Sequence, residues 1–165
     1  LEPLAPGECG CIVIAGMGGL LISDILEKSK DTAAYADQLI LQPNTCEYDL
    51  RKYLMRNGYE IIDERGIHEG RHFYLIIKCR AAGDAFSEKT DLEEKYAESR
   101  LFTGDIMPVR KSPEDIAYLK NLKYKTERIL LGMSVAEAPD GRERVEKRER
   151  YEALADVLDC ILREI

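Results

Sequence analysis

The sequence predicts an α/β fold, in which two parallel strands and an antiparallel hairpin share one sheet and a pair of antiparallel helices follows. Three observations support this prediction. Short apolar runs at residues 11–15 and 38–41 are each followed by an amphipathic segment. Two β-rich runs, at residues 59–64 and 73–78, have no helical pattern between them. Two long amphipathic segments fill most of the chain beyond these runs.

The first two strands alternate with helices. A short continuous apolar run such as residues 11–15 is typical of a strand that is covered on both faces. The segment 18–28 follows, and its apolar residues Leu21, Ile22, Ile25 and Leu26 have helical spacing. The second strand, residues 38–41, is expected to end at Pro43, because proline cannot donate to a sheet ladder.

The next segments form a helix and then a hairpin. Residues 46–57 predict a helix that stops at Asn57-Gly58 and has Leu50, Tyr53 and Leu54 as its apolar stripe. The two β-rich runs are separated by about eight polar or glycine-containing residues, so we expect them to pair antiparallel. Residues 81–111 have weak periodicity and predict a long connection or a short helix.

A helical hairpin closes the chain. Ser112 can cap a helix, Pro113 suits its first position and Asp115 can complete a capping box. Residues 138–141 predict a turn, and the helix after it has a stripe of Leu154, Leu158, Ile161 and Ile165. Two long helices with a short link predict an antiparallel, coiled-coil-like pair. We therefore expect two domains, residues 1–110 and residues 111–165.

The composition narrows the class of protein. The chain has 165 residues, of which 45% are hydrophobic, and its formal net charge of -7 argues against a general nucleic-acid binder. No apolar run is long enough to span a membrane, and no signal peptide is evident. Five scattered cysteines suit reduced thiols in a cytoplasmic protein.

A glycine-rich turn is expected where the first strand ends. Glycines at 16, 18 and 19 would let the backbone approach a ligand closely, and the next helix offers free N–H groups at its start. The alternative is a tight strand-to-helix turn with a purely structural role. At the end of the second strand, the amides of Gln42 and Asn44 suit the edge of a nucleobase, notably adenine. The alternative is that Asn44 merely caps the following helix.

Because both motifs follow parallel strands, we expect them to lie side by side and to form one wall of a cleft that receives a purine. The run from His68 to His72 matches the H-E-x-x-H pattern of zinc proteases, but that chemistry needs a helix, and this run spans a turn that leads into a strand. We expect no metal site there.

The basic residues near the C-terminus have two interpretations. Residues 110–150 carry a positive balance, which could follow a phosphate backbone. They could equally form a solvated helix with ion pairs at i,i+3 and i,i+4 spacing. We favour the solvated helix for Arg148 and Arg150, and we expect Arg142 and Arg144, which lie near the predicted turn, to contact RNA.

Together these segments resemble one family. The string from Ile14 to Gly19, the string from Leu39 to Asn44, and the later Leu50, Arg51 and Leu54 are similar to the bacterial tRNA (adenine22-N1)-methyltransferases. The resemblance implies that the first domain is the C-terminal portion of a Rossmann-like class I methyltransferase and that the second is its helical coiled coil. In that superfamily the parallel sheet ends in an antiparallel hairpin, which agrees with the predicted order.

The resemblance also implies a reaction, the transfer of a methyl group from S-adenosyl-L-methionine to N1 of an adenine in tRNA. In this sequence it implies Asn44 as the catalytic residue that orients the adenine, and a cofactor-binding set of Ala15, Gly16 and Met17. The substrate-binding set would be Gly18, Gly19, Gln42, Pro43 and Arg51. Arg51 could instead pair with Asp49 or Glu47. The residues that would bind RNA are Lys120, Lys123, Lys125, Arg128, Arg142 and Arg144.

The sequence departs from this family in two places. The first three strands of the family, with the acidic loop that holds S-adenosylmethionine, have no counterpart here, and the chain opens on Leu1 without an initiating Met. We therefore expect that an N-terminal portion is lacking and that this fragment alone is inactive. Gly104 is followed by Asp105, where most members have Gly-Pro.

Two other functions stay open. One is a methyltransferase of the same fold that acts on a small molecule, and the helical hairpin counts against it. The other is a non-enzymatic module that binds RNA or protein. A half-sheet would also expose an edge strand, so we expect that the fragment can pair through that edge with another copy or with its missing half.

Overall fold

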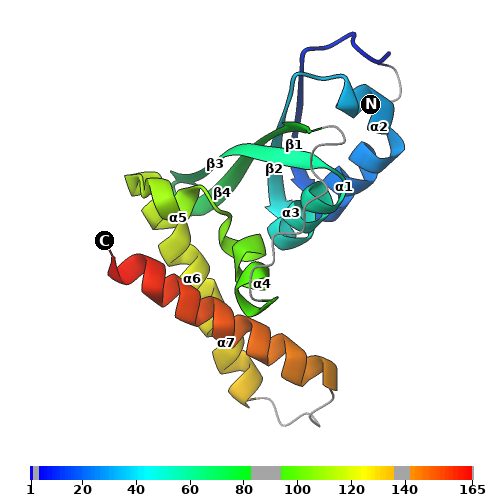
Figure 1. Cartoon of the computed structure of the whole chain (residues 1–165). Coiled ribbons are helices and arrows are strands. Elements are labelled where there is room, and N and C mark those ends of the chain that lie inside the picture. Colours follow the sequence, from blue (N-terminus) through cyan, green and yellow to red (C-terminus); the bar gives the residue numbers. More distant parts are fainter. Residues whose placement is uncertain (2–3, 83–93, 136–141, 165) are drawn as a thin grey trace. The chain divides into compact units, whose positions relative to one another are not determined.

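The computed structural model describes residues 1, 4–82, 94–135 and 142–164 (Figure 1). The chain divides into two compact units, Leu1–Thr90 and Asp91–Ile165. The division lies before the domain boundary expected after residue 110, because the short helices that precede this boundary pack with the helical hairpin.

The first unit is built on one sheet of four strands in the order β1-β2-β4-β3. The strands are β1 (Cys11–Gly18), β2 (Gln38–Thr45), β3 (Tyr59–Glu69) and β4 (His72–Ala81). β1 and β2 are parallel, whereas β4 is antiparallel to both β2 and β3. The helices are α1 (Gly19–Lys28), α2 (Lys30–Ala34) and α3 (Glu47–Arg56). This arrangement confirms the predicted α/β fold.

Buried and exposed residues alternate along the strands, so the core lies on the face of the sheet that the helices cover. Ile12 and Ile14 of β1 are buried, whereas Val13 between them is 65% exposed. The buried set continues through β2, β4 and the helices, and consists of Leu39, Leu41, Leu75, Ile77, Ile22, Leu26, Leu50 and Leu54. β1 lies at the edge of the described sheet, and the described residues cover only one of its faces, whereas its apolar run is typical of a strand covered on both.

Both parallel strands are longer than the sequence predicted. β1 continues to Gly18, and β2 passes through Pro43 to Thr45. The prediction that Pro43 ends the strand was wrong, because β4 pairs with β2 only along Leu39–Leu41. Beyond that point β1 is the only described strand that pairs with β2, so the missing N–H of Pro43 costs no hydrogen bond between β2 and β4.

The hairpin is also longer than predicted. β3 and β4 pair up to Glu69 and His72, and only Gly70 and Arg71 remain as the turn, with Gly70 at φ +60°. The eight-residue polar connection was therefore wrong: most of it is strand, with Gly66 buried opposite Leu75. The H-E-x-x-H run forms strand, turn and strand, and not the helix on which a zinc protease carries this pattern.

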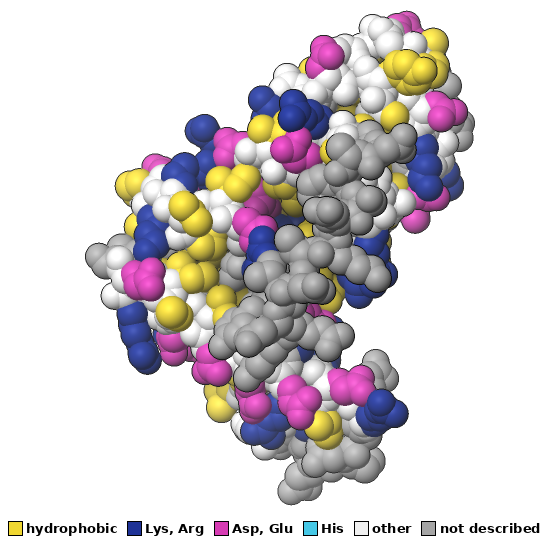
Figure 2. All heavy atoms as spheres, viewed as in Figure 1, with side chains coloured by type: hydrophobic (Ala, Val, Ile, Leu, Met, Phe, Trp, Pro, Cys, Tyr) yellow, Lys and Arg dark blue, Asp and Glu magenta, His cyan; other side chains and the backbone are white. Residues whose placement is uncertain are grey.

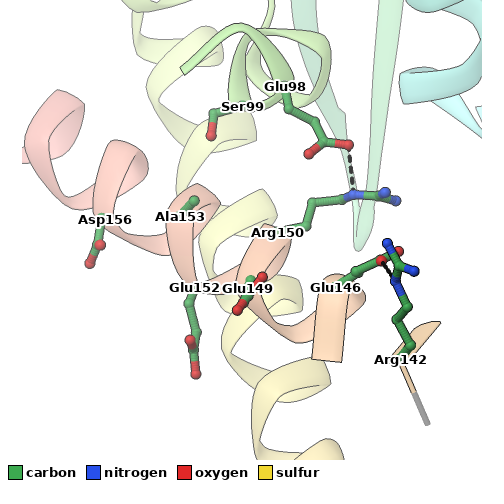
Figure 3. A pocket seen from close by; sticks show the side chains of 9 residues that line it. All are labelled: Glu98, Ser99, Arg142, Glu146, Glu149, Arg150, Glu152, Ala153 and Asp156. Atoms are coloured by element: carbon green, nitrogen blue, oxygen red, sulfur yellow. Dashed lines mark hydrogen bonds and ion pairs between the residues drawn. The ribbon is translucent and has the colours of Figure 1, made fainter. Parts of the chain in front are cut away.

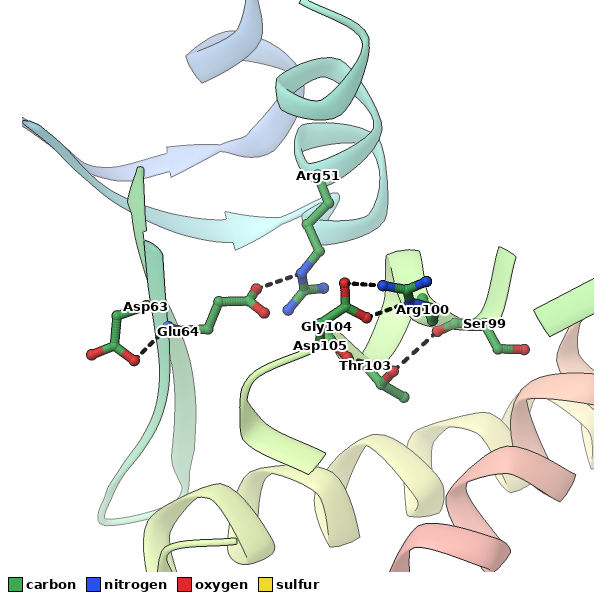
Figure 4. A network of polar contacts seen from close by, with 8 residues as sticks. All are labelled: Arg51, Asp63, Glu64, Ser99, Arg100, Thr103, Gly104 and Asp105. Atoms are coloured by element: carbon green, nitrogen blue, oxygen red, sulfur yellow. Dashed lines mark hydrogen bonds and ion pairs between the residues drawn. The ribbon is translucent and has the colours of Figure 1, made fainter. Parts of the chain in front are cut away.

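A buried ion pair joins α3 to the hairpin. The Arg51 Nε donates to the Glu64 Oε1 over 2.6 Å, and each side chain is 1% exposed (Figure 4). Arg51 lies on α3 and Glu64 on β3, so the pair fixes the helix over the sheet. From the sequence, Asp49 and Glu47 were the expected acidic partners of Arg51, and Glu64 was not foreseen.

The sheet interior also buries a thiol. Cys79 of β4 lies opposite Leu39 of β2 and is fully buried. Burial raises the pKa of its thiol to about 12, because a thiolate would lose its hydration there. Cys11 and Cys160, in contrast, are exposed.

The second unit contains four described helices. They are α4 (Glu94–Thr103), α5 (Met107–Arg110), α6 (Pro113–Val135) and α7 (Arg142–Arg163). The predicted capping box is present, since the Asp115 N–H donates to the Ser112 Oγ and the Ser112 N–H donates to the Asp115 carboxylate. The turn predicted at 138–141 lies outside the described residues.

α6 and α7 form the predicted antiparallel pair. Ion pairs join Lys111 to Glu164 and Lys123 to Asp159, so later residues of one helix meet earlier residues of the other. The buried centre of the pair consists of Leu119, Leu154 and Leu158. Around it pack Phe102, Leu122, Tyr151, Ile161 and Leu162. At the end of α4, the Thr103 hydroxyl donates to the Ser99 carbonyl and Arg100 pairs with Asp105 (Figure 4).

The buried ion pair predicts a specific pattern of stabilities. Arg51→Met leaves the Glu64 carboxylate buried and unpaired, which should lower the free energy of unfolding by about 3–5 kcal/mol. The double variant with Glu64→Met should recover most of this loss, because no buried charge remains. Chemical denaturation measures both variants.

The exposed pair between Arg65 and Asp63 is the matched control, with Arg65 68% exposed. Arg65→Met should change the free energy of unfolding by less than about 1 kcal/mol. Equal losses in the Arg51 single and double variants would contradict the buried-charge explanation.

Candidate functional site

The two motifs predicted to carry function lie side by side. The parallel register pairs Met17 with Pro43 and Gly18 with Thr45, at the carboxyl ends of β1 and β2. Ala15, Gly16 and Met17 are exposed here, as is Asn44. The expectation that both motifs share one edge of the sheet is therefore confirmed.

A bulge replaces the turn that was predicted at Gly16. Ala15 pairs with Gln42 and Met17 with Pro43, so Gly16 has no partner in the register of β2. Its φ of +77° is a left-handed conformation that favours glycine. A bulge leaves one residue outside the ladder, so the backbone N–H of Gly16 is available to a side chain.

Gln42 supplies that side chain. The Gly16 N–H donates to the Gln42 Oε1 over 2.9 Å. The Gln42 Nε2 donates to the Asn44 Oδ1 over 2.9 Å and to the Pro43 carbonyl oxygen over 3.2 Å. One amide thus joins the bulge of β1 to the end of β2. The sequence showed that these residues would be neighbours, but it gave no signal for this hydrogen bond.

Asn44 does not cap the following helix. α3 begins at Glu47, its N-cap residue is Cys46 at φ +58°, and no side chain caps it. The alternative interpretation of Asn44 as a helix cap was therefore wrong. The Asn44 side chain is instead held by Gln42 at the exposed end of β2.

Gly18 and Gly19 have packing reasons to be glycine. A Cβ on Gly19 would overlap the Cys46 carbonyl oxygen and would lie 3.1 Å from the Leu50 Cβ. A Cβ on Gly18 would lie 3.1 Å from the Thr45 Oγ1. At Gly16, in contrast, no atom of the described residues lies within 4 Å of the Cβ position. Of the three glycines, Gly16 therefore leaves the most room for a ligand, and the substrate-binding role of the other two stays a prediction.

Two further predicted substrate residues are buried. Pro43 is buried within β2, and Arg51 is bonded to Glu64 below the surface. A phosphate would have to displace Glu64 to reach the Arg51 Nε, so the structure gives Arg51 a role in stability. Its role in substrate binding stays a prediction.

The basic residues of the hairpin differ in their surroundings. Lys123 pairs with Asp159 and Glu127, and the bond to Asp159 is the main reason why the pKa of its ammonium is raised. Arg142 pairs with Glu146, although the Arg142 side chain is 93% exposed. Arg144 donates to the Met133 carbonyl over 2.6 Å and thereby ties α7 to the end of α6.

The other three cations lie along α6. Within the described part of the chain, Lys120 and Lys125 have no acidic partner, and both are exposed. The Arg128 guanidinium lies 6.0 Å from the centre of the Tyr124 ring, which is an exposed aromatic with 58% of its surface open. Tyr124 was not among the predicted residues, although its spacing of four from Lys120 and Arg128 could have indicated it.

α7 presents a different surface. A groove between α4 and α7 is lined mostly by acidic and other polar side chains (Figure 3). Its lining consists of Glu98, Ser99, Arg142, Glu146, Glu149, Arg150, Glu152, Ala153 and Asp156. Both arginines are engaged there, Arg150 with Glu98 and Arg142 with Glu146. The excess of carboxylates disfavours a phosphate backbone in this groove.

Charges of both signs lie interspersed on the face drawn in Figure 2.

Within the described ranges, no helix has the length and apolarity needed to cross a membrane. Among the same residues, no group of three or more His, Cys, Asp or Glu side chains is arranged to hold a metal ion.

Comparisons with known proteins agree on one family. The model of the tRNA (adenine(22)-N(1))-methyltransferases, TrmK, matches residues 1–155. The chain is 29% identical over 165 residues to the Bacillus subtilis tRNA (adenine(22)-N(1))-methyltransferase. This alignment covers 96% of the chain and 66% of that relative. The chain thus spans slightly less than two thirds of the length of this relative.

Solved structures give the same result. The structure of B. subtilis TrmK is similar with a TM-score of 0.72 and 26% identity, over 98% of this chain and 66% of that one. Streptococcus pneumoniae Sp1610, solved in complex with S-adenosyl-L-methionine, is similar with a TM-score of 0.67 and 28% identity, over 93% of this chain and 60% of that one.

The packing at Gly19 predicts a loss of stability. Gly19→Ala forces a methyl group against the Cys46 carbonyl at the start of α3. Overpacking of this kind should lower the free energy of unfolding by about 1–3 kcal/mol. Thermal denaturation measures the effect.

Gly132→Ala in α6 is the matched control, since none of the residues that the structure describes comes within 4 Å of the Cβ position there. It should raise stability by up to about 1 kcal/mol, because alanine favours a helix. A Gly19 variant as stable as the original protein would show that the contact between α1 and α3 can open at no cost.

Proposed function

Because this chain belongs to the tRNA (adenine(22)-N(1))-methyltransferase family, we propose that its protein transfers a methyl group from S-adenosyl-L-methionine to N1 of an adenine in tRNA. The observation that carries this proposal is the joined pair of strand ends at Gly16 and Asn44. Ligands of open α/β sheets bind at the carboxyl ends of parallel strands. We also propose that the protein acts in the cytoplasm.

The strand ends suit a reaction that needs little acid–base help. Residues 15–18 and 42–45 contain no titratable side chain. Adenine N1 attacks with its own lone pair, so it needs no general base for activation. Catalysis then depends on holding the reacting atoms in line and on extracting the base from its stack. Asn44 is proposed to orient the adenine.

The bulge of β1 fits a cofactor that lies against the backbone. The exposed residues Ala15, Gly16 and Met17 carry no charge, and the Cβ direction of Gly16 is open. When bound, S-adenosyl-L-methionine supplies an electrophilic methyl group. We propose that these residues form the floor beneath it and that Gly18 and Gly19 keep the neighbouring backbone close to β2.

The helical hairpin is proposed to hold the tRNA body. The residues assigned to this contact are Lys120, Lys123, Lys125, Arg128, Arg142 and Arg144. Lys120, Lys125 and Arg128 are the strongest of them, because they share α6 with an exposed tyrosine and lie away from the acidic lining of the groove. Cations without acidic partners release counterions from RNA without first breaking an ion pair.

Asn44→Ala in the full-length protein should lower the rate of tRNA methylation by about 100-fold or more, because the adenine loses its orienting contact. The melting temperature should stay close to that of the original protein, since Asn44 is exposed. Labelled methyl transfer to tRNA measures the rate. Thr45→Ala, at the neighbouring exposed position, should change the rate only slightly. Near-normal turnover in the Asn44 variant would remove Asn44 from the mechanism.

Charge reversal on α6 should weaken tRNA binding. A variant with Lys120→Glu, Lys125→Glu and Arg128→Glu should lower the slope of log affinity against log salt by about 2–3. Reversal of Arg142 and Arg144 should lower it less, because both already have partners in the protein. Filter binding at several salt concentrations measures the slopes.

Arg148→Glu is the control on α7, where Arg148 pairs with the exposed Glu152. This variant should leave the slope unchanged. Equal slopes in the α6 variant and the control would contradict the proposed tRNA surface.

A further inference from the structure

The hydrogen bond between the Gly16 N–H and Gln42 determines which atoms donate and which accept in the hydrogen bonds of Gln42 with Pro43 and Asn44. A backbone N–H can only donate, so the atom of Gln42 that meets Gly16 must be the amide oxygen, at 2.9 Å. The two amide positions of a glutamine are often exchangeable in a structure. Here the Gly16 N–H fixes which of the two positions holds the Gln42 oxygen.

The amide nitrogen of Gln42 must then face the end of β2. It lies 2.9 Å from the Asn44 side chain and 3.2 Å from the Pro43 carbonyl oxygen. An N–H group needs an acceptor, and Asn44 can offer only its Oδ1. The Oδ1 of Asn44 is therefore turned toward Gln42, and its Nδ2 faces away. Among the described residues, the Asn44 Nδ2 has no acceptor.

We propose that Gln42 is a positioning residue that presents Asn44 to the target adenine as a hydrogen-bond donor. This inference rests on the proposed function. The donor cannot serve N1, because N1 must keep its lone pair for the methyl group. Adenine has two other ring acceptors, N3 and N7, and the Asn44 Nδ2 donates to one of them. The exocyclic amine is itself a donor and cannot accept a hydrogen bond from the Nδ2.

The first test removes the hydrogen-bond donor of residue 42 but keeps the number of heavy atoms in its side chain. In the full-length protein, Gln42→Glu keeps an oxygen for the Gly16 N–H, but its carboxylate cannot donate to Asn44. Carboxylate and Oδ1 would repel, so the Asn44 amide should turn and lose its outward donor. The turnover number kcat should fall by about 100-fold, while the KM for tRNA changes only a few-fold.

Gln38→Glu is the matched control. Gln38 lies on β2 and, by the two-residue alternation of a strand, on the same face as Gln42. It introduces the same charge without contact to Asn44, so kcat should stay near that of the original protein. NMR gives a readout besides activity: Gln42→Glu should shift the Asn44 side-chain amide signals and leave the Gly16 N–H protected from exchange. If the Asn44 signals disappeared and the Gly16 N–H also lost its protection, the strand ends would have unfolded, and Gln42 would act by holding them together and not by orienting Asn44.

The second test uses the substrate. The target adenosine of a synthetic tRNA is replaced by 7-deazaadenosine in one sample and by 3-deazaadenosine in another. The original protein should lose about tenfold in kcat/KM on one of them, because one hydrogen bond is gone. The Gln42→Glu variant should lose little more on that analogue, since the same contact is already missing.

The outcomes separate the two claims. A protein that methylates the natural tRNA and both analogues equally well contradicts the donor role of Asn44 and leaves the proposed function intact. A Gln42→Glu variant with full kcat and unchanged Asn44 signals contradicts the positioning role of Gln42. A protein that does not methylate tRNA contradicts the proposed function, and this inference with it.

Discussion

The hydrogen bond from the Gly16 N–H to the Gln42 side chain is the interaction on which the candidate site depends. It exists because the parallel register leaves Gly16 outside the ladder and because a left-handed backbone turns its N–H toward β2. With it, one side chain holds the ends of β1 and β2 in a fixed relation and decides which way the Asn44 amide points. The chemistry of the site thus follows from a backbone irregularity rather than from a charged group.

The rest of the first unit keeps those strand ends in place. α1 starts directly after β1, and the absence of a side chain at Gly19 lets it meet the start of α3. α3 in turn is joined to β3 by Arg51 and Glu64, whose charges are buried together. A buried ion pair is costly to desolvate and adds little net stability, but it penalises any arrangement that separates its members. These contacts join the two helices to the sheet that ends in the candidate site, and a site without titratable groups depends on such support for accurate positioning.

Much of this architecture is present in local patterns of the sequence. The apolar runs predicted β1 and β2, Asn57-Gly58 marked the end of α3, and Ser112 with Asp115 formed the expected capping box. The errors arose where tertiary context overrides local preference. Pro43 usually ends a strand, but here it lies beyond the pairing with β4, and the polar residues 65–69 belong to a strand whose partner lies across the turn. The Gln42 bonds could not be predicted, because they depend on a one-residue shift in register. Glu64 as the partner of Arg51 depends likewise on the packing of a helix on a distant strand.

Labelling of the buried Cys79 thiol by a chemical reagent reports whether the central sheet is intact. This thiol lies opposite Leu39, and its pKa of about 12 keeps it protonated near neutral pH. An alkylating reagent can therefore modify Cys79 only in molecules whose sheet has opened, whereas the exposed Cys11 and Cys160 react in the closed state. Cys9 and Cys46 are partly buried, so the labelling of Cys79 has to be followed by itself, for example by mass spectrometry of its peptide, and its rate then reports how often the sheet opens.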